Sequence, residues 1–143
     1  NTTITRPGDS PSPITVGAYN HFNNSIYIHS GRGYTIGGLV KPDLAAPGVD
    51  VSGPSIGYRN GDSIPMTTRT GTSVAAAHVA GAVANLLSWG IVEGYNITMS
   101  EASVKAFLIR GAKRNPALSY PNREWGYGAL DLYETFLRLR EVR

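Results

Sequence analysis

The chain has 143 residues, the length of one ordinary domain, with 41% hydrophobic residues and a net charge of +3. The absence of cysteine excludes disulfide scaffolds, thiol catalysis and cysteine metal sites. Because the net charge is small and no nucleic-acid-reading motif is found, we expect no nucleic-acid partner. We also expect no apolar run to reach membrane-spanning length, and hence no membrane partner.

The first half of the chain predicts short strands joined by turns. Residues 1–12 are rich in Thr, Pro and Ser and predict a loop. Four short apolar or β-branched runs, each bounded by turn residues, predict strands: 13–18, 25–29, 44–46 and one beginning at 49–51. Residues 55–69 contain Asn60-Gly61, a pair that suits the turn between antiparallel strands, and predict a hairpin.

The second half predicts three helices. The first runs from Ser73 to about Trp89 and ends at Gly90, and its apolar residues occupy nearly every face, so we expect it to be buried all round. A capping-box pattern at 98–101 predicts a second helix over 100–110. The third is expected over 129–140. Its predicted buried residues are Leu130, Tyr133, Phe136 and Leu137. Strands followed by helices predict a layered α/β fold.

Two hydroxyl residues, Thr72 and Ser73, lie at the N-terminus of the first predicted helix, directly after Gly71. The first N–H groups of a helix have no partner within it, and they carry partial positive charge that suits a developing anion. Ser73 is therefore a candidate nucleophile. The alternative is that Thr72 or Ser73 merely caps a core helix, as Ser and Thr often do.

Five motifs, in the same order along the chain, resemble those of the subtilisin-like serine proteases. Residues 71–75 and 78–81, Gly-Thr-Ser-Val-Ala and His-Val-Ala-Gly, resemble that family's nucleophile motif. The other four are similar to its core strand, its Ser-x-Arg-Gly segment, its Lys-Pro-Asp…Ala-Pro-Gly signature and the start of its closing helix. They lie at 14–18, 30–33, 41–49 and 125–131.

The resemblance implies part of a subtilisin-like three-layer α/β domain with a mostly parallel sheet that is incomplete in this chain. Residues 1–143 would then be the C-terminal portion of the peptidase domain. Ser73 would be the nucleophile and its own N–H an oxyanion donor, with Gly71 and Thr72 adjacent to a protein or peptide substrate. Val74 and Ala77 replace the family's usual Met and Pro. A similarity to a clostridial branch associated with spore germination would imply a bacterial, secreted, cell-envelope or spore-associated protein.

None of the three histidines is expected to be the catalytic base. His78 follows Ser73 by five residues, which places it about 140° further around the helix, and the matching histidine of the family is a packing residue. His21 and His29 lack the Gly-Thr that follows the family's catalytic histidine. We therefore expect all three to be structural or exposed.

The residues that would activate Ser73 are not found. Asp43 and Asp131 match non-catalytic segments of the family and are expected to bond nearby backbone, and Asn1 and Asn20 lack the motif of the oxyanion asparagine. In the family, the triad Asp and His precede the serine. We therefore expect an upstream part of the same domain as a partner, and an isolated segment that is inactive and either poorly soluble or self-associating. No cofactor or metal site is evident, and calcium binding by the parent protein is left open.

Two rival hypotheses belong to other classes. One is a subtilase-like pseudoenzyme or protein-interaction subdomain that has lost the upstream triad residues. The other is a basic binding module that uses three late arginines, Arg138, Arg140 and Arg143, although a solvated helix face explains these residues better.

Overall fold

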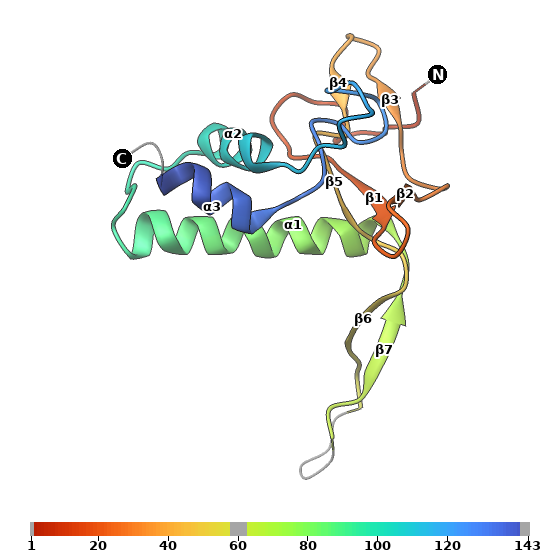
Figure 1. The fold of residues 1–143 in the computed structure, drawn as a ribbon, viewed down its shortest axis with the longest axis horizontal. Coiled ribbons are helices and arrows are strands. Elements are labelled where there is room, and N and C mark those ends of the chain that lie inside the picture. Colours follow the sequence, from red (N-terminus) through yellow and green to blue (C-terminus); the bar gives the residue numbers. More distant parts are fainter. Residues whose placement is uncertain (1, 58–62, 141–143) are drawn as a thin grey trace.

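The computed structural model of the chain describes residues 2–57 and 63–140. Its strands are β1 (Val16–Asn20), β2 (Ser25–Ile26), β3 (Gly33–Tyr34), β4 (Val40–Lys41), β5 (Leu44–Pro47), β6 (Val51–Pro54) and β7 (Met66–Arg69). Its helices are α1 (Thr72–Leu87), the π-helical turn η1 (Ser88–Val92), α2 (Glu101–Gly111) and α3 (Leu132–Arg140). Small sheets and helices pack together as the α/β pattern predicts (Figure 1).

The central sheet has the order β2-β1-β5. Strands β1 and β5 are parallel, with Val16 opposite Leu44, and β2 is antiparallel to β1. Ala45 extends the sheet through a parallel bridge to Ala129. This small sheet, in which β1 and β5 are parallel, confirms the predicted incomplete sheet. The strand expected at 25–29 ends at Ile26, because the chain turns there and the Ser30 N–H donates to the Tyr27 carbonyl at 2.9 Å.

Helix α1 packs along β1 and β5 with one face only. Its buried residues are Ala75, Val79, Ala82 and Leu86. The opposite face is exposed and carries mostly small residues: Ala76, Ala77, His78, Ala80, Gly81, Ala84 and Asn85. The prediction of a helix buried all round is therefore wrong. Helix α1 has apolar residues on every face, but the other described residues cover only one side of it.

The expectation that no apolar run reaches membrane-spanning length is also wrong. The helical segment Thr72–Val92 has 21 residues and is apolar enough to cross a membrane by length and composition. This is weak evidence for a membrane, because the core helix of a soluble protein passes the same test.

The end of α1 differs from the predicted stop at Gly90. The chain continues through η1, and Gly90 is buried where a Cβ atom would overlap Met99. Gly90 therefore lies inside the helical segment, packed against Met99, and does not end it. In α2 the predicted helix is confirmed, but its capping box joins Ser100 and Ser103, with the Ser100 N–H donating to Ser103 Oγ at 2.8 Å.

Helix α3 begins at Leu132, later than predicted, because Ala129 forms backbone bridges to Lys113 and Ala45. The side chain of Asp131 accepts from the Glu134 N–H at 2.9 Å and so caps the helix. The prediction that Tyr133 is buried is wrong, since its side chain is 75% exposed. Thr135 is buried instead, packed against Gly111, where a Cβ atom would overlap it.

A buried ion-pair network joins the sheet to α2 and to the N-terminal loop. The Asp43 carboxylate lies 2.7 Å from Lys41 Nζ and 2.8 Å from Lys105 Nζ, and it also accepts from the Thr15 N–H at 2.7 Å. Lys41 Nζ donates to the Pro13 carbonyl at 2.9 Å. Burial lowers the pKa of Lys41, and the neighbouring Asp43 carboxylate opposes that shift.

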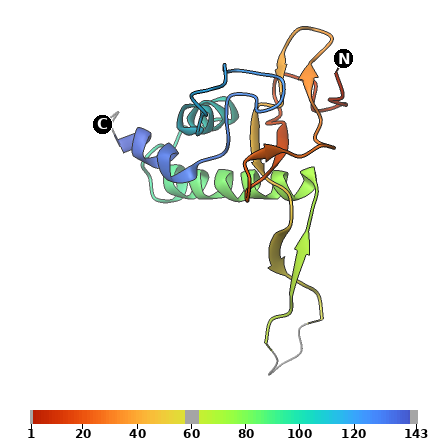
Figure 2. The ribbon, with the colours of Figure 1, turned by 45° about the vertical axis from the view of Figure 1, so that its right-hand side comes forward.

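Strands β6 and β7 form an antiparallel hairpin that projects away from the helices and the central sheet (Figures 1 and 2). Val51 stands opposite Arg69 at its base, and Pro54 stands opposite Met66. The second strand lies within the predicted hairpin of 55–69, but the first is β6, which lies before that range and corresponds to the separate strand expected to begin at 49–51. The expected turn at Asn60-Gly61 lies outside the described residues.

Candidate active site at the start of helix α1

The start of α1 is fixed to the end of β5 by two glycines. The Gly71 N–H donates to the Gly48 carbonyl at 2.8 Å. A Cβ atom at Gly48 would lie 2.7 Å from the Ala18 Cβ atom and 2.8 Å from the Gly71 oxygen. Only glycine therefore lets the chain after β5 approach the chain before α1 this closely.

A second link ties the base of the hairpin together just before the helix. The Asp50 N–H donates to the Thr70 hydroxyl at 2.9 Å, and that hydroxyl donates to Asp50 Oδ1 at 3.2 Å. Asp50 adopts a positive φ of 49°, which suits a short polar residue in a tight turn. Residues 48–50 and 70–71 thus form one ordered support for the first turn of α1.

Ser73 is exposed in that first turn, two residues after the Gly71 cap. The Gly71 carbonyl accepts from the Val74 N–H at 3.2 Å, which closes the turn. The N–H of Ser73 precedes the first intrahelical bond and lies at the positive end of a 16-residue helix. The serine hydroxyl and a donor for a developing oxyanion therefore stand on the same residue.

Ser73 lines a groove between the hairpin and the helix, with a volume of about 290 Å³. Pro54 and Arg69 line the groove from the hairpin side, and Val74 and Ala77 from the helix side. An open groove with a hydroxyl group on its wall can receive an extended chain whose carbonyl approaches that hydroxyl.

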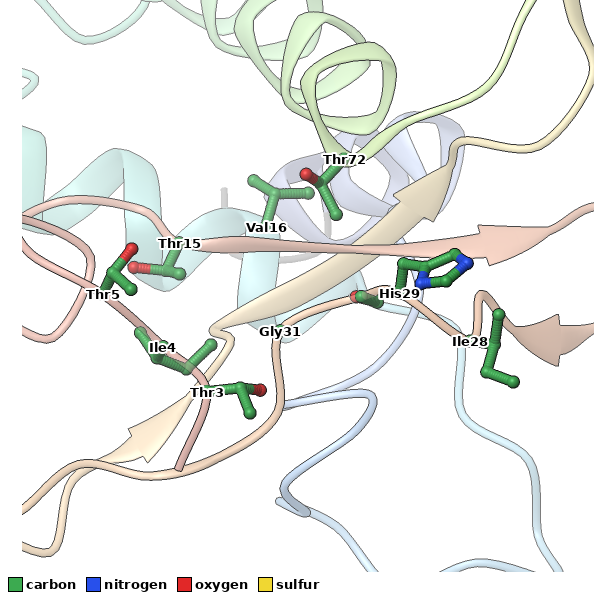
Figure 3. A pocket seen from close by; sticks show the side chains of 10 residues that line it. Thr3, Ile4, Thr5, Thr15, Val16, Ile28, His29, Gly31 and Thr72 are labelled. Atoms are coloured by element: carbon green, nitrogen blue, oxygen red, sulfur yellow. The ribbon is translucent and has the colours of Figure 1, made fainter. Parts of the chain in front are cut away.

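Thr72 faces a different hollow, of about 470 Å³, on the other side of the helix start. Figure 3 shows this hollow from close by, with Thr72 bordering it from the helix, Val16 from strand β1 and His29 from the loop after β2. Gly71 itself is half-buried and supports the turn through its backbone. The structure therefore places Gly71, Thr72 and Ser73 together, with Ser73 and Thr72 facing separate spaces.

The three histidines do not meet Ser73. All three are exposed, as predicted, and the His78 Nδ1 atom lies 3.0 Å from the Val74 carbonyl of its own helix. His29 packs edge-on against Tyr27, with ring centroids 5.3 Å apart. Within residues 2–57 and 63–140, Ser73 has no histidine hydrogen bond that would activate its hydroxyl.

Two acidic residues that could have been taken for the triad acid are structural. Asp43 is held in the buried network with Lys41 and Lys105, and Asp131 caps α3. Both also bond nearby backbone N–H groups, as predicted. In the described part of the chain, no three His, Asp or Glu side chains are placed to hold a metal ion.

Sequence reasoning missed the Asp50–Thr70 link and the position of Arg69 on the groove. The predicted hairpin over 55–69 carried no signal for the link, because Asp50 lies five residues before it and only the observed pairing of Val51 with Arg69 brings Asp50 beside Thr70. The side of the hairpin on which Arg69 lies could not be read from the sequence, because the alternation of polar and apolar residues along 66–69 is weak.

The comparisons with known proteins agree with the motif order. The family model described as "Subtilase family" matches residues 1–128. The membrane-bound transcription factor site-1 protease of Mus musculus is 36% identical over 140 residues, which cover 94% of this chain and 12% of that protein. The subtilisin-like protease SBT6.1 of Arabidopsis thaliana is 34% identical over 94% of this chain and 13% of its own length.

Among solved structures, the Clostridium perfringens CspB protease aligns with a TM-score of 0.86 and 35% identity. The alignment covers 99% of this chain and 30% of that protein. The chain thus spans about an eighth of the curated relatives and under a third of this structural relative. Because these relatives come from an animal, a plant and a bacterium, the expected bacterial, spore-germination branch stays a prediction. The subtilase motifs, their structural support and the family match together establish that this chain belongs to the subtilase family.

Proposed function

We propose that this chain is the serine-bearing, C-terminal portion of a subtilase catalytic domain, and that Ser73 is the nucleophile that hydrolyses peptide bonds through an acyl-enzyme. The observation that carries the proposal is the exposed Ser73 hydroxyl on the groove, with its own N–H at the positive end of α1. Attack on a peptide carbonyl would place the developing oxyanion within reach of that N–H, which stabilises the transition state more than the ground state.

The triad Asp and His are expected on a segment outside residues 1–143. The lack of a histidine on Ser73 within the described residues supports this, since an unassisted serine hydroxyl is a weak nucleophile at neutral pH. In subtilisin, loss of the triad costs about a millionfold in turnover. The isolated chain is therefore expected to be inactive.

The exposed features of the fold fit a domain that packs further chain onto this one. The face of α1 opposite the sheet carries small residues that permit close approach. Strand β2 pairs only with Tyr19 and Asn20 of β1, so the start of β1 at Val16, which borders the hollow, is not covered by β2. Relatives that are three to eight times longer supply such chain in their own domains. Left uncovered, this face and edge favour self-association.

A fluorophosphonate probe tests the proposal in the full-length protein that carries this chain. We expect labelling that disappears in Ser73→Ala and persists in Ser55→Ala, a serine outside the groove. The isolated chain should not label. Absence of labelling in a folded and processed full-length protein would favour the pseudoenzyme, and strong labelling of the isolated chain would contradict an external base.

A further inference from the structure

Among the described residues that line the groove beside Ser73, one is charged, Arg69 at the end of β7. The hairpin register sets Arg69 opposite Val51, at the base of the hairpin and four residues before Ser73. The other residues on the groove are neutral. The charge of the described groove lining therefore comes from one guanidinium group.

This guanidinium is available to a ligand. None of the ion pairs found within the described residues involves Arg69. Asp50, which lies across the base of the hairpin, directs its Oδ1 atom to the Thr70 hydroxyl. Arg69 is also exposed, so its charge remains solvated until a ligand enters the groove.

The size and position of the groove limit what it can hold. Its volume of about 290 Å³ is at the small end for ligand sites, which suits a side chain or two of a peptide. Ser73 lines the same groove, and an extended peptide advances about 3.3–3.6 Å per residue. A side chain in the groove therefore belongs to a residue close to the bond that Ser73 attacks.

We propose that Arg69 is a specificity-determining residue that selects Asp or Glu at a substrate position within two residues of the scissile bond. This inference rests on the proposed function of Ser73. A carboxylate can accept two parallel hydrogen bonds from a guanidinium, which joins charge attraction to geometric selection. The small Val74 and Ala77 side chains on the helix side leave room for the acidic side chain to reach Arg69.

The test uses the full-length protein and a peptide library read by mass spectrometry, followed by kcat/KM for matched peptides that carry Glu, Gln or Lys at the selected position. An exposed ion pair supports a preference of up to about fivefold for Glu over Gln. Arg69→Glu should reverse this and cut the Lys peptide faster than the Glu peptide by a similar factor. Because a reversal is a gain of activity, a misfolded variant cannot imitate it.

Arg123→Glu is the matched control, since it makes the same charge change on an exposed residue that does not line this groove. It should keep the wild-type preference. The wild-type preference should also weaken as salt is raised, because the pair is solvent-exposed. An Arg69→Glu protein that cuts peptides with the wild-type preference overturns the inference and leaves Ser73 untouched. A wild-type protein that neither labels with fluorophosphonate nor cuts peptides overturns the proposed function, and the inference with it.

Discussion

The N–H of Gly71 donates a 2.8 Å hydrogen bond to the carbonyl of Gly48, which joins the end of strand β5 to the first turn of the helix that carries Ser73. The two glycines belong to two separate sequence motifs, Ala-Pro-Gly and Gly-Thr-Ser. Their contact explains why the Ala-Pro-Gly motif needs its glycine: a Cβ atom at Gly48 would lie 2.8 Å from the Gly71 oxygen.

Gly48→Ala should therefore destabilise the fold. The new Cβ would stand 2.7 Å from the Ala18 Cβ atom in the core, and overpacking of this kind costs about 1–3 kcal/mol. Urea unfolding followed by tryptophan fluorescence at submicromolar concentration measures the loss. Gly53→Ala is the control, because a Cβ there meets no atom within 4 Å, and it should change the unfolding free energy by less than about 0.5 kcal/mol. Equal stability of the two variants would refute the close approach at Gly48.

Asp43→Asn should be among the most destabilising single changes. It removes the carboxylate that the buried Lys41 and the half-buried Lys105 share, and breaking a buried pair in this way costs about 3–5 kcal/mol. The same urea experiment measures it. Glu134→Gln breaks the exposed pair with Arg138 and should cost no more than about 0.5 kcal/mol. A loss below about 1 kcal/mol for Asp43→Asn would mean that the lysines find other partners or water.

Tyr19 should make the fold sensitive to alkaline pH. Burial, and secondarily the Asp131 carboxylate, raise the pKa of Tyr19 above its ordinary value of about 10. The fold therefore favours the neutral phenol. The stability that this contributes is complete below the ordinary pKa and is lost as the pH rises through the raised, folded-state pKa.

Tyr19→Phe should flatten the fall in stability above about pH 10, as measured by urea unfolding at a series of pH values. The phenylalanine ring can keep the packing against Trp125, whose ring centroid lies 5.2 Å away. Tyr133→Phe makes the same change at an exposed ring and should leave the alkaline curve as in the wild type. Identical curves for Tyr19→Phe and the wild type would contradict the burial of the phenol.

The sequence predicted the parts of this fold that are set by local chemistry and by motif order. The strand at 44–46, the Ser100 cap and the placement of Ser73 at a helix start follow from short runs of residues, and the structure has all three. That Ser73 is the nucleophile stays a prediction, because it depends on groups that the described residues do not supply.

Which faces of α1 and α3 are buried, and which hairpin residues pair, depends on tertiary packing that the sequence does not reveal. Tyr133 fits the apolar stripe of its helix, yet the contact of Gly111 with Thr135 rotates α3 so that Tyr133 faces outward. Helix α1 has apolar residues on every side, so its sequence cannot tell which side the described chain covers. The pairing of Asp50 with Thr70 depends on a hairpin register that the 19 residues between them leave open.

The exposed face of α1 gives a test, independent of catalysis, of the proposal that further chain of the same domain packs onto this one. A Cβ atom at Gly81 meets nothing within 4 Å in this chain. In an exposed helix interior, Gly→Ala raises stability by about 0.8–1.0 kcal/mol. Gly81→Ala should therefore stabilise the isolated chain by about this amount. If further chain packs closely on α1 in the full-length protein, the added methyl should instead cost about 1–3 kcal/mol there.

Ala106→Gly on the exposed side of α2 is the matched control, and it should cost about 0.8–1.0 kcal/mol in both proteins because nothing in the proposal covers that position. Urea unfolding of the two proteins, with and without each substitution, gives the four differences. Further chain would be shown to pack on the small-residue face of α1 if Gly81→Ala raised the free energy of unfolding of the isolated chain and lowered that of the full-length protein. Ala106→Gly should meanwhile lower the free energy of unfolding of both. Stabilisation by Gly81→Ala in both would mean that this face stays open in the longer protein. The triad residues that Ser73 needs would then have to reach it without covering the helix.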